Sequence, residues 1–242
     1  MPARAGVVRR IMTYLAIDLE MTGLNVKKDR ILEIGALRME DGKPTGEFSA
    51  LVNPHCVIPE AITQLTGITP EMADGGESLS DVLPRFLEFA GELPLLGHNL
   101  SFDYSFLKQA FVNAGLPFER AGIDTLKLAR KFLPGTQKKK LTELRTLFGI
   151  DTGAVHRAVS DAYAAALVYE RLLKDHGDTA PDAFNPKPLH VNIKKQQPIT
   201  IPQREQLTRL LSEYPEKLSD PPDIDHLTRS EASRLIERLL HS

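Results

Sequence analysis

The chain has 242 residues, of which 42% are hydrophobic and 26% charged, and its formal net charge is −2. These values are ordinary for a globular protein with one substantial domain and something small beside it. The single cysteine, Cys56, excludes a disulfide framework and a thiolate zinc site within one chain. We expect a cytoplasmic protein, because no stretch is long enough to span a membrane and no secretory cleavage site follows Arg9 and Arg10.

The first part of the chain predicts an antiparallel meander. Residues 1–12 are interpreted as an N-terminal tail. Apolar runs then predict strands over 13–20, 31–38 and 46–52. The dipeptide Asp41-Gly42 between the last two runs is a strong hairpin signal.

After Asn53-Pro54, helical patterns alternate with single short strands. Prolines in the first turn indicate short helices at Pro59 and Pro70. Further helices are predicted over 80–90, 103–115, 125–132, 141–149 and 160–174, with Ser80 and Ser160 as caps, and strands over 93–97 and 122–124. The predicted fold is α/β: a mixed five-stranded sheet, three antiparallel strands followed by two parallel ones, flanked by helices.

The composition changes after this region. Five prolines and no apolar period over 176–202 predict an extended linker between a domain at 13–175 and a C-terminal module at 203–242. In the module, apolar periodicity predicts helices over 203–214 and 228–240, and Thr228 with Glu231 has capping-box spacing. Because two helices bury little surface alone, we expect them to dock on the main domain, on a second copy or on a partner.

Asp18 and Glu20 lie in the first predicted strand at alternate positions. Residues i and i+2 of a strand point to the same face, so the two carboxylates project side by side. Two close anions are costly to bury without a cation. The pair is therefore interpreted as half of a site for Mg²⁺ or Mn²⁺, or as a strand end whose acids face water.

Two later stretches supply further candidate ligands. Asp103 falls where an apolar strand gives way to a helix, although it or Ser101 could simply cap that helix. His156 lies in a predicted loop with Asp161 in the first helical turn behind it, where an acid is also favoured by the helix dipole. Asp124 is a competing acid, interpreted as the cap of the next helix.

In chain order these residues read acid-x-acid, His-Asn-x-x-Phe-Asp and His-x4-Asp. The three motifs, within about Thr13 to Lys174, resemble the DEDDh exonuclease family of the ribonuclease H-like fold. The segment 52–69 is typical of the proofreading exonucleases of bacterial replicases, the group that includes the ε subunit of DNA polymerase III. The sequence departs from the commonest first motif only at Met21, where threonine is frequent.

The resemblance implies a 3′–5′ exonuclease that releases nucleoside 5′-monophosphates by two-metal-ion hydrolysis. It implies that Asp18, Glu20, Asp103 and Asp161 hold two divalent ions, Mg²⁺ or Mn²⁺, and that His156 is the general base. It also implies that the 3′-terminal nucleotide is bound by Thr22, Gly23, Leu24, His98, Asn99 and Phe102. Apolar Leu24 and Phe102 could equally belong to the core.

Other interpretations stay open at this stage. DNA 3′ ends, preferably single-stranded, are the expected substrate, but short or structured RNA is an alternative, and so is an inactive nucleic-acid-binding or scaffold subunit. Lys138, Lys139 and Lys140 could track phosphates or form a solvated loop. Residues 206–210 resemble a sliding-clamp peptide, although an amphipathic helix explains them. Because no polymerase domain is visible, proofreading would need a separate polymerase, and the C-terminal helices could contact it or a second copy.

Overall fold

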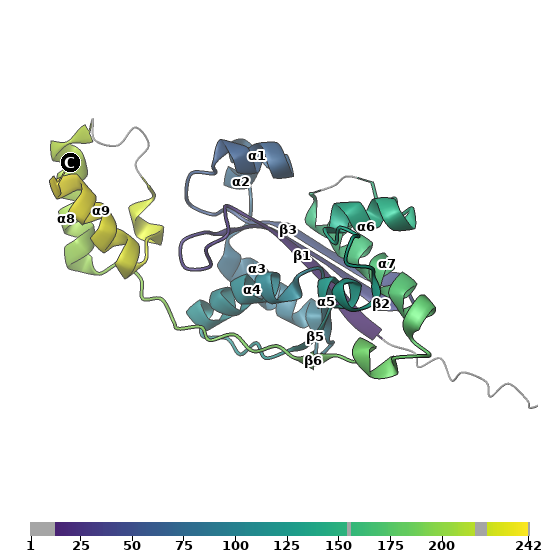
Figure 1. Ribbon diagram of the computed structural model, residues 1–242. Helices are drawn as coiled ribbons and strands as arrows, with labels where there is room; N and C mark the ends of the chain where they lie inside the picture. The colour runs from purple at the N-terminus through teal and green to yellow at the C-terminus, as the bar shows by residue number, and fades with distance from the viewer. Residues whose placement is uncertain (1–12, 154–155, 216–221, 242) are drawn as a thin grey trace, which may run out of the picture.

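A six-stranded mixed sheet forms the centre of the protein (Figure 1). The computed structural model describes residues 13–153, 156–215 and 222–241, so the predicted tail lies outside the described residues. Strands β1 (Thr13–Met21), β2 (Ile31–Glu40) and β3 (Lys43–Leu51) are antiparallel, and β4 (Leu95–Gly97) and β5 (Ala121–Asp124) run parallel to β1. The order β3-β2-β1-β4-β5-β6 confirms the predicted fold class and places β1 inside the sheet.

The sheet has six strands where five were predicted, and the sixth lies in the segment predicted as a linker. β6 (Lys187–Pro188) pairs antiparallel with β5, and a 3₁₀ turn, η1 (Pro181–Phe184), precedes it. Phe184 is buried there, with its ring 5.4 Å from that of Phe132. A proline without an N–H can occupy an edge strand, and a buried aromatic ring such as Phe184 packs well, but neither produces a period that sequence reasoning can detect.

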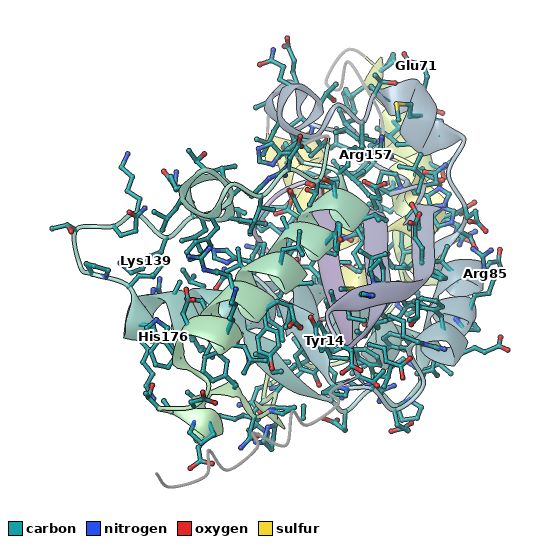
Figure 2. All side chains as sticks on the ribbon, turned by 90° about the vertical axis from the view of Figure 1, so that its right-hand side faces the viewer. Tyr14, Glu71, Arg85, Lys139, Arg157 and His176 are labelled. Carbon is teal, nitrogen blue, oxygen red and sulfur yellow. The ribbon has the colours of Figure 1, made fainter. Side chains whose placement is uncertain are left out.

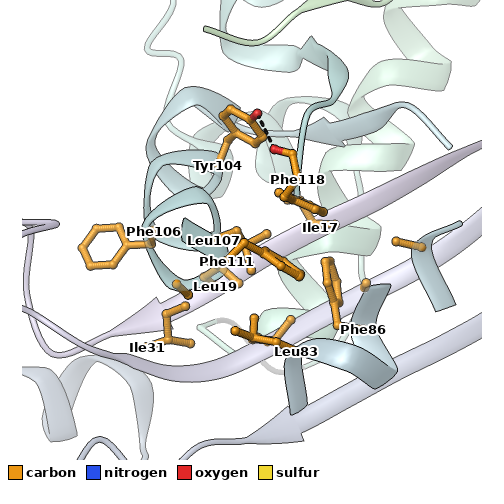
Figure 3. Close-up of a cluster of buried hydrophobic side chains, with 14 of the residues drawn as sticks. Ile17, Leu19, Ile31, Leu83, Phe86, Tyr104, Phe106, Leu107, Phe111 and Phe118 are labelled. Carbon is orange, nitrogen blue, oxygen red and sulfur yellow. Dashed lines mark hydrogen bonds between the residues drawn. The ribbon is translucent and has the colours of Figure 1, made fainter. Parts of the chain in front are cut away.

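Helices cover both faces of the sheet. Leu15, Ile17 and Leu19 of β1 point to the face covered by α3 (Leu79–Ala90) and α4 (Leu100–Ala114), where they join the large apolar core shown in Figure 3. Tyr14 and Ala16 point to the opposite face, which packs against α5 (Thr125–Phe132), α6 (Leu141–Phe148) and α7 (Ala158–His176). Since strand residues alternate, Asp18 and Glu20 share the α7 face.

Three helix starts differ from the prediction. Ser78, not Ser80, caps α3 by accepting a hydrogen bond from the Asp81 N–H. Helix α4 begins at Leu100, three residues before the predicted start at Asp103. Helix α7 begins at Ala158, and the Ser160 hydroxyl donates to the Thr152 carbonyl instead of capping. Serine is frequent near helix starts, so residue type alone does not select which one caps.

Two short helices, α1 (Glu60–Thr66) and α2 (Pro70–Asp74), follow β3. They form a small apolar cluster of their own with β2, made of Leu32, Ile58, Ile68 and Ala73. The hairpin between β2 and β3 has positive φ at both Asp41 (49°) and Gly42 (75°), as the tight turn predicted from this dipeptide requires.

The C-terminal module contains α8 (Ile201–Glu213), a 3₁₀ turn η3 (Ile224–His226) and α9 (Arg229–His241), with α8 and α9 side by side in Figure 1. The Thr228–Glu231 capping box is present, because each residue's side chain bonds the other's N–H. The module has its own buried cluster: Ile199, Leu207, Leu210, Ala232, Leu235 and Leu239. Within the described residues, no helix is long and apolar enough to cross a membrane.

Candidate active site

Asp18 and Glu20 lie toward the C-terminal end of β1. β2 pairs with this part of the strand, with Asp18 opposite Gly35 and Glu20 opposite Glu33, and β4 pairs with β1 a little earlier, at Leu15 and Ala16. Glu20 is only 8% exposed, and Asp18 is partly buried. The interpretation as a strand end that merely faces water is therefore wrong for Glu20.

Asp103 comes to this end of the sheet through the β4–α4 connection. β4 is parallel to β1, so both strands end at the same edge. Asn99 turns the chain with a left-handed φ of 67°, and its N–H donates to Asp124 Oδ1 at 3.1 Å. Asp103 sits in the first turn of α4 and is 5% exposed, and neither it nor Ser101 is the N-cap residue.

His156 and Asp161 come from the start of α7, which lies directly on β2. A Cβ on Gly35 would be 2.3 Å from the backbone of Ala158, so a residue without a side chain is needed for this approach. The His156 N–H donates to Asp161 Oδ2 at 3.1 Å. One ligand atom each of Glu20, His156 and Asp161 lies within 4.8 Å of the others.

The four carboxyl groups repel one another and are poorly hydrated. Burial, followed by the charges of Asp103, Glu20 and Asp161, raises the pKa of Asp18 well above its usual range. Burial raises the pKa of Glu20 to about 8, with Asp161 and Glu33 adding to the shift. Burial also raises the pKa of Asp103 to about 7 and raises the pKa of Asp161. An arrangement that resists ionisation in this way is one that bound cations would stabilise.

Two arginines beside the acids escaped the sequence analysis. Arg145 of α6 is buried and donates to Asp161 Oδ1 at 3.1 Å. Arg157 forms a two-pronged ion pair with Glu33, using Nε at 3.2 Å and Nη2 at 2.9 Å, and Figure 2 shows it where α7 begins. Glu33 carried a readable signal, since it is a lone acid in the apolar run 31–34. Arg145 carried none, because it lies in an ordinary amphipathic helix.

The first three residues predicted to bind substrate lie in the β1–β2 connection. Leu24 is 82% exposed, so its assignment to the core is wrong. The Thr22 N–H already donates to the Arg30 carbonyl at 2.8 Å, and the Thr22 hydroxyl accepts from the Arg30 N–H. Gly23 lies so close to Asp29 that a Cβ would be 2.5 Å from its carboxylate. The connection is thus fixed at its base and presents Leu24 to solvent.

The other three residues have different surroundings. Phe102 is half-buried and packs edge-on against Phe106, with ring centroids 5.4 Å apart. Asn99 is exposed. Both ring nitrogens of His98 are engaged, Nδ1 with the Thr125 hydroxyl at 2.9 Å and Nε2 with the Lys139 carbonyl at 2.8 Å.

His98 therefore connects the loop that contains Lys138, Lys139 and Lys140, here called the lysine loop, to the end of β4. Lys139 and Lys140 line a pocket of about 370 Å³ together with His98, Leu126, Arg130 and Leu141. The ammonium group of Lys139, a residue labelled in Figure 2, donates hydrogen bonds to two carbonyls of its own loop. Asp124 caps α5, as predicted, by accepting from the Leu126 N–H at 3.0 Å.

Comparisons with known proteins find relatives over about two thirds of the chain. The profile of the exonuclease family, RNase_T, matches residues 15–169. The DNA polymerase III subunit epsilon of Aquifex aeolicus is 42% identical over 164 residues, which cover 67% of this chain and 81% of that subunit. The PolC-type DNA polymerase III of Clostridium perfringens is 40% identical over 153 residues, which cover 63% of this chain but 11% of that polymerase.

Among solved structures, E. coli exonuclease I in complex with a dT13 oligonucleotide has a TM-score of 0.61 at 21% identity, covering 71% of this chain and 43% of that one. This likeness concerns the fold. The family match extends over more than half of the chain and contains all four acids and His156. The chain therefore belongs to the exonuclease family and is an enzyme, a 3′–5′ exonuclease of the hydrolase class.

Proposed function

We propose that the chain is a metal-dependent DNA exonuclease that removes nucleoside 5′-monophosphates from 3′ ends, preferably single-stranded ones, in replication proofreading or repair. The observation that carries this proposal is the group of four carboxyl groups, Asp18, Glu20, Asp103 and Asp161, which are collected at one sheet edge with raised pKa values. The Aquifex and Clostridium relatives, both named as DNA polymerase III proteins, support DNA as the substrate.

The donor set fits hard divalent cations. All four acids offer oxygen, which Mg²⁺ and Mn²⁺ prefer, and the cluster carries more negative charge than Arg145 balances. Asp18, Glu20, Asp103 and Asp161 would hold two such ions, which supply Lewis-acid stabilisation of the phosphate charge and an acidified water. The carboxylates must lose their protons to bind the ions. Protons and metal ions therefore compete for these carboxylates, and the raised pKa values act against ion binding.

His156 is proposed as the general base. Its side chain is 39% exposed, and its Nδ1 lies 4.0 Å from Asp161 Oδ2, so the ring stands at the rim of the acidic cluster and faces solvent. An imidazole there can accept a proton from an attacking water near neutral pH. The left-handed φ of 58° at His156 and its N–H bond to Asp161 hold the residue at this rim.

Leu24 is proposed to stack beside the terminal base. A large apolar side chain that is 82% exposed on an anchored loop is suited to insertion against a base face. We propose Phe102, Asn99 and His98 as further walls of the terminal-nucleotide site, with His98 acting through the lysine loop that it holds. A separate polymerase, contacted through the C-terminal helices, is the proposed partner.

A paired digestion tests the substrate. Single-stranded DNA and RNA of one sequence, each labelled at the 5′ end, are incubated with the protein and Mg²⁺ or Mn²⁺, with and without excess chelator. We expect stepwise shortening from the 3′ end, faster on DNA and abolished by chelator. Faster decay of the RNA would overturn the DNA assignment, and digestion that persists in chelator would overturn the metal mechanism.

A further inference from the structure

A second group of ligand-type side chains lies where the C-terminal module meets the exonuclease fold. His55 belongs to the β3–α1 connection, whereas Asp223 and His226 belong to the turn before α9. Asp223 Oδ2 is 2.8 Å from His226 Nδ1 and 3.4 Å from His55 Nδ1. One ligand atom of each residue lies within 4.8 Å of the other two. Two imidazoles and a carboxylate thus converge from segments that are far apart in sequence.

The local backbone helps to direct His55 and Asp223 to the same point. His55 has a left-handed φ of 50°, unusual for a residue with a side chain, and its N–H is held by Asn53 Oδ1 at 2.9 Å. Asp223 uses its other oxygen to accept from the Asp225 N–H at 3.1 Å, which starts the η3 turn and leaves Oδ2 for the histidines. The two imidazole rings are stacked, with centroids 3.5 Å apart.

We propose that His55, Asp223 and His226 form a binding site for a transition-metal dication such as Zn²⁺, separate from the acidic active site. Two neutral imidazoles and one carboxylate are a donor set for Zn²⁺ or Co²⁺, with water in the fourth position, whereas Mg²⁺ prefers an all-oxygen set.

Ion binding requires a small rearrangement. The lone pair of each Nδ1 lies in its ring plane, so two parallel rings cannot both point at one ion, and at least one ring must turn out of the stack. The side chains have room to do this, because His55, Asp223 and His226 are 29%, 43% and 50% exposed. The site is therefore adaptable and accessible from solvent.

A bound ion would fasten the module to the exonuclease fold. Another contact across this joint is the ion pair of Arg30 with Glu231 at 2.7 Å, and in the segment before the module Gln196 Nε2 donates to the Lys27 carbonyl at 3.0 Å. The buried cluster of the module is drawn from residues 199–239 among those the structure describes, so the module can separate without opening an apolar core. Arg30 and Lys27 belong to the connection that carries Leu24, so the ion would also steady that connection.

Zinc stoichiometry tests the site. Metal-free full-length protein is dialysed against Zn²⁺ with excess Mg²⁺, and bound zinc is counted by elemental analysis in the wild type and in His55→Ala, His226→Ala and His190→Ala. His190 is an exposed histidine outside the cluster and serves as the matched control. We expect His55→Ala and His226→Ala each to bind one equivalent less zinc than the wild type, and His190→Ala to bind the same amount.

A second readout distinguishes zinc bound at His55, Asp223 and His226 from zinc bound at the active site. In the wild type, Zn²⁺ should slow proteolysis of the segment 189–200 and raise the melting temperature, and both effects should vanish in His226→Ala. Since His55 lies on the other side of the joint, His55→Ala provides the same test if His226→Ala misfolds. Equal zinc content in the wild type and both variants, or zinc protection that survives them, would overturn the proposal.

Discussion

The protein contains two groups of converging ligand side chains, and they differ in almost every physical respect. The first group consists of Asp18, Glu20, Asp103 and Asp161, which are largely buried and offer only oxygen donors. It lies on β1 and on the helices α4 and α7, which pack against the sheet. The second group consists of His55, Asp223 and His226. It is partly exposed, contains two imidazoles and connects two separately packed parts of the chain. The first holds like charges together in a buried site, which is unfavourable without a cation, whereas the second is partly exposed and can rearrange.

The two groups differ in how firmly the backbone beneath them is supported. Like charges held in a buried site need stiff support, and a strand with hydrogen-bonded neighbours on both sides supplies it. A site that only fastens a small module can be made from turns. The following predictions test this contrast, from the largest expected effect to the smallest.

Asp103→Asn should lower the exonuclease rate by several orders of magnitude, because an amide cannot supply the negative charge that divalent cations require. The fold should persist, since the amide is isosteric and removes charge repulsion. The measurement is the rate of 3′ shortening in Mg²⁺, with circular dichroism as the folding check. Glu88→Gln, an exposed acid on α3, is the matched control and should keep the wild-type rate. Near-normal activity in Asp103→Asn would remove this residue from the site.

His156→Ala should lower kcat by about 10²–10⁴, the usual contribution of a general base, with little change in KM. Single-turnover digestion over a pH series checks this. The pH dependence of the log rate in His156→Ala should differ from that of the wild type, because the proposed proton acceptor is gone. A variant that keeps the wild-type pH profile would show that another group takes the proton.

Arg157→Ala should destabilise the fold through Glu33, whose side chain is only 2% exposed. Breaking a buried ion pair costs about 3–5 kcal/mol, and we expect the lower end because Arg157 itself is 43% exposed. Urea unfolding measures the loss. The double variant Arg157→Ala/Glu33→Gln should recover part of it, because no charge is then left buried. A stability equal to that of the wild type in Arg157→Ala would mean that water replaces the arginine.

The stability of the metal-free protein should fall as pH rises from about 4, the ordinary pKa of a carboxyl group. The pKa values of Glu20 and Asp103 rise to about 8 and about 7 in the folded state. Between these limits the folded chain binds more protons than the unfolded chain, so rising pH favours unfolding. Urea midpoints in chelator should decline up to about pH 8, and Glu20→Gln should flatten the decline. A rising or level wild-type curve would contradict the raised pKa values.

Sequence reasoning could predict the sheet, because β1 and β2 are long apolar runs and Asp41-Gly42 fixes the turn between β2 and β3. It could also name the acids, since the three motifs that contain them occur together in the order of a known family, although each acid alone has an ordinary structural explanation. It could not predict Arg145, Arg157 or the His55 cluster as partners, because these contacts join segments through tertiary packing. The β6 segment escaped detection because two residues have no period.

The central claim is that the four carboxyl groups exist to hold divalent cations. Calorimetric titration of Mn²⁺ into metal-free protein at pH 8 tests it directly, with Asp18→Asn compared to the wild type and to Glu88→Gln. The account predicts Mn²⁺ binding in the wild type and in Glu88→Gln, and its loss or a large weakening in Asp18→Asn. Equal Mn²⁺ affinity and stoichiometry in all three proteins would contradict it.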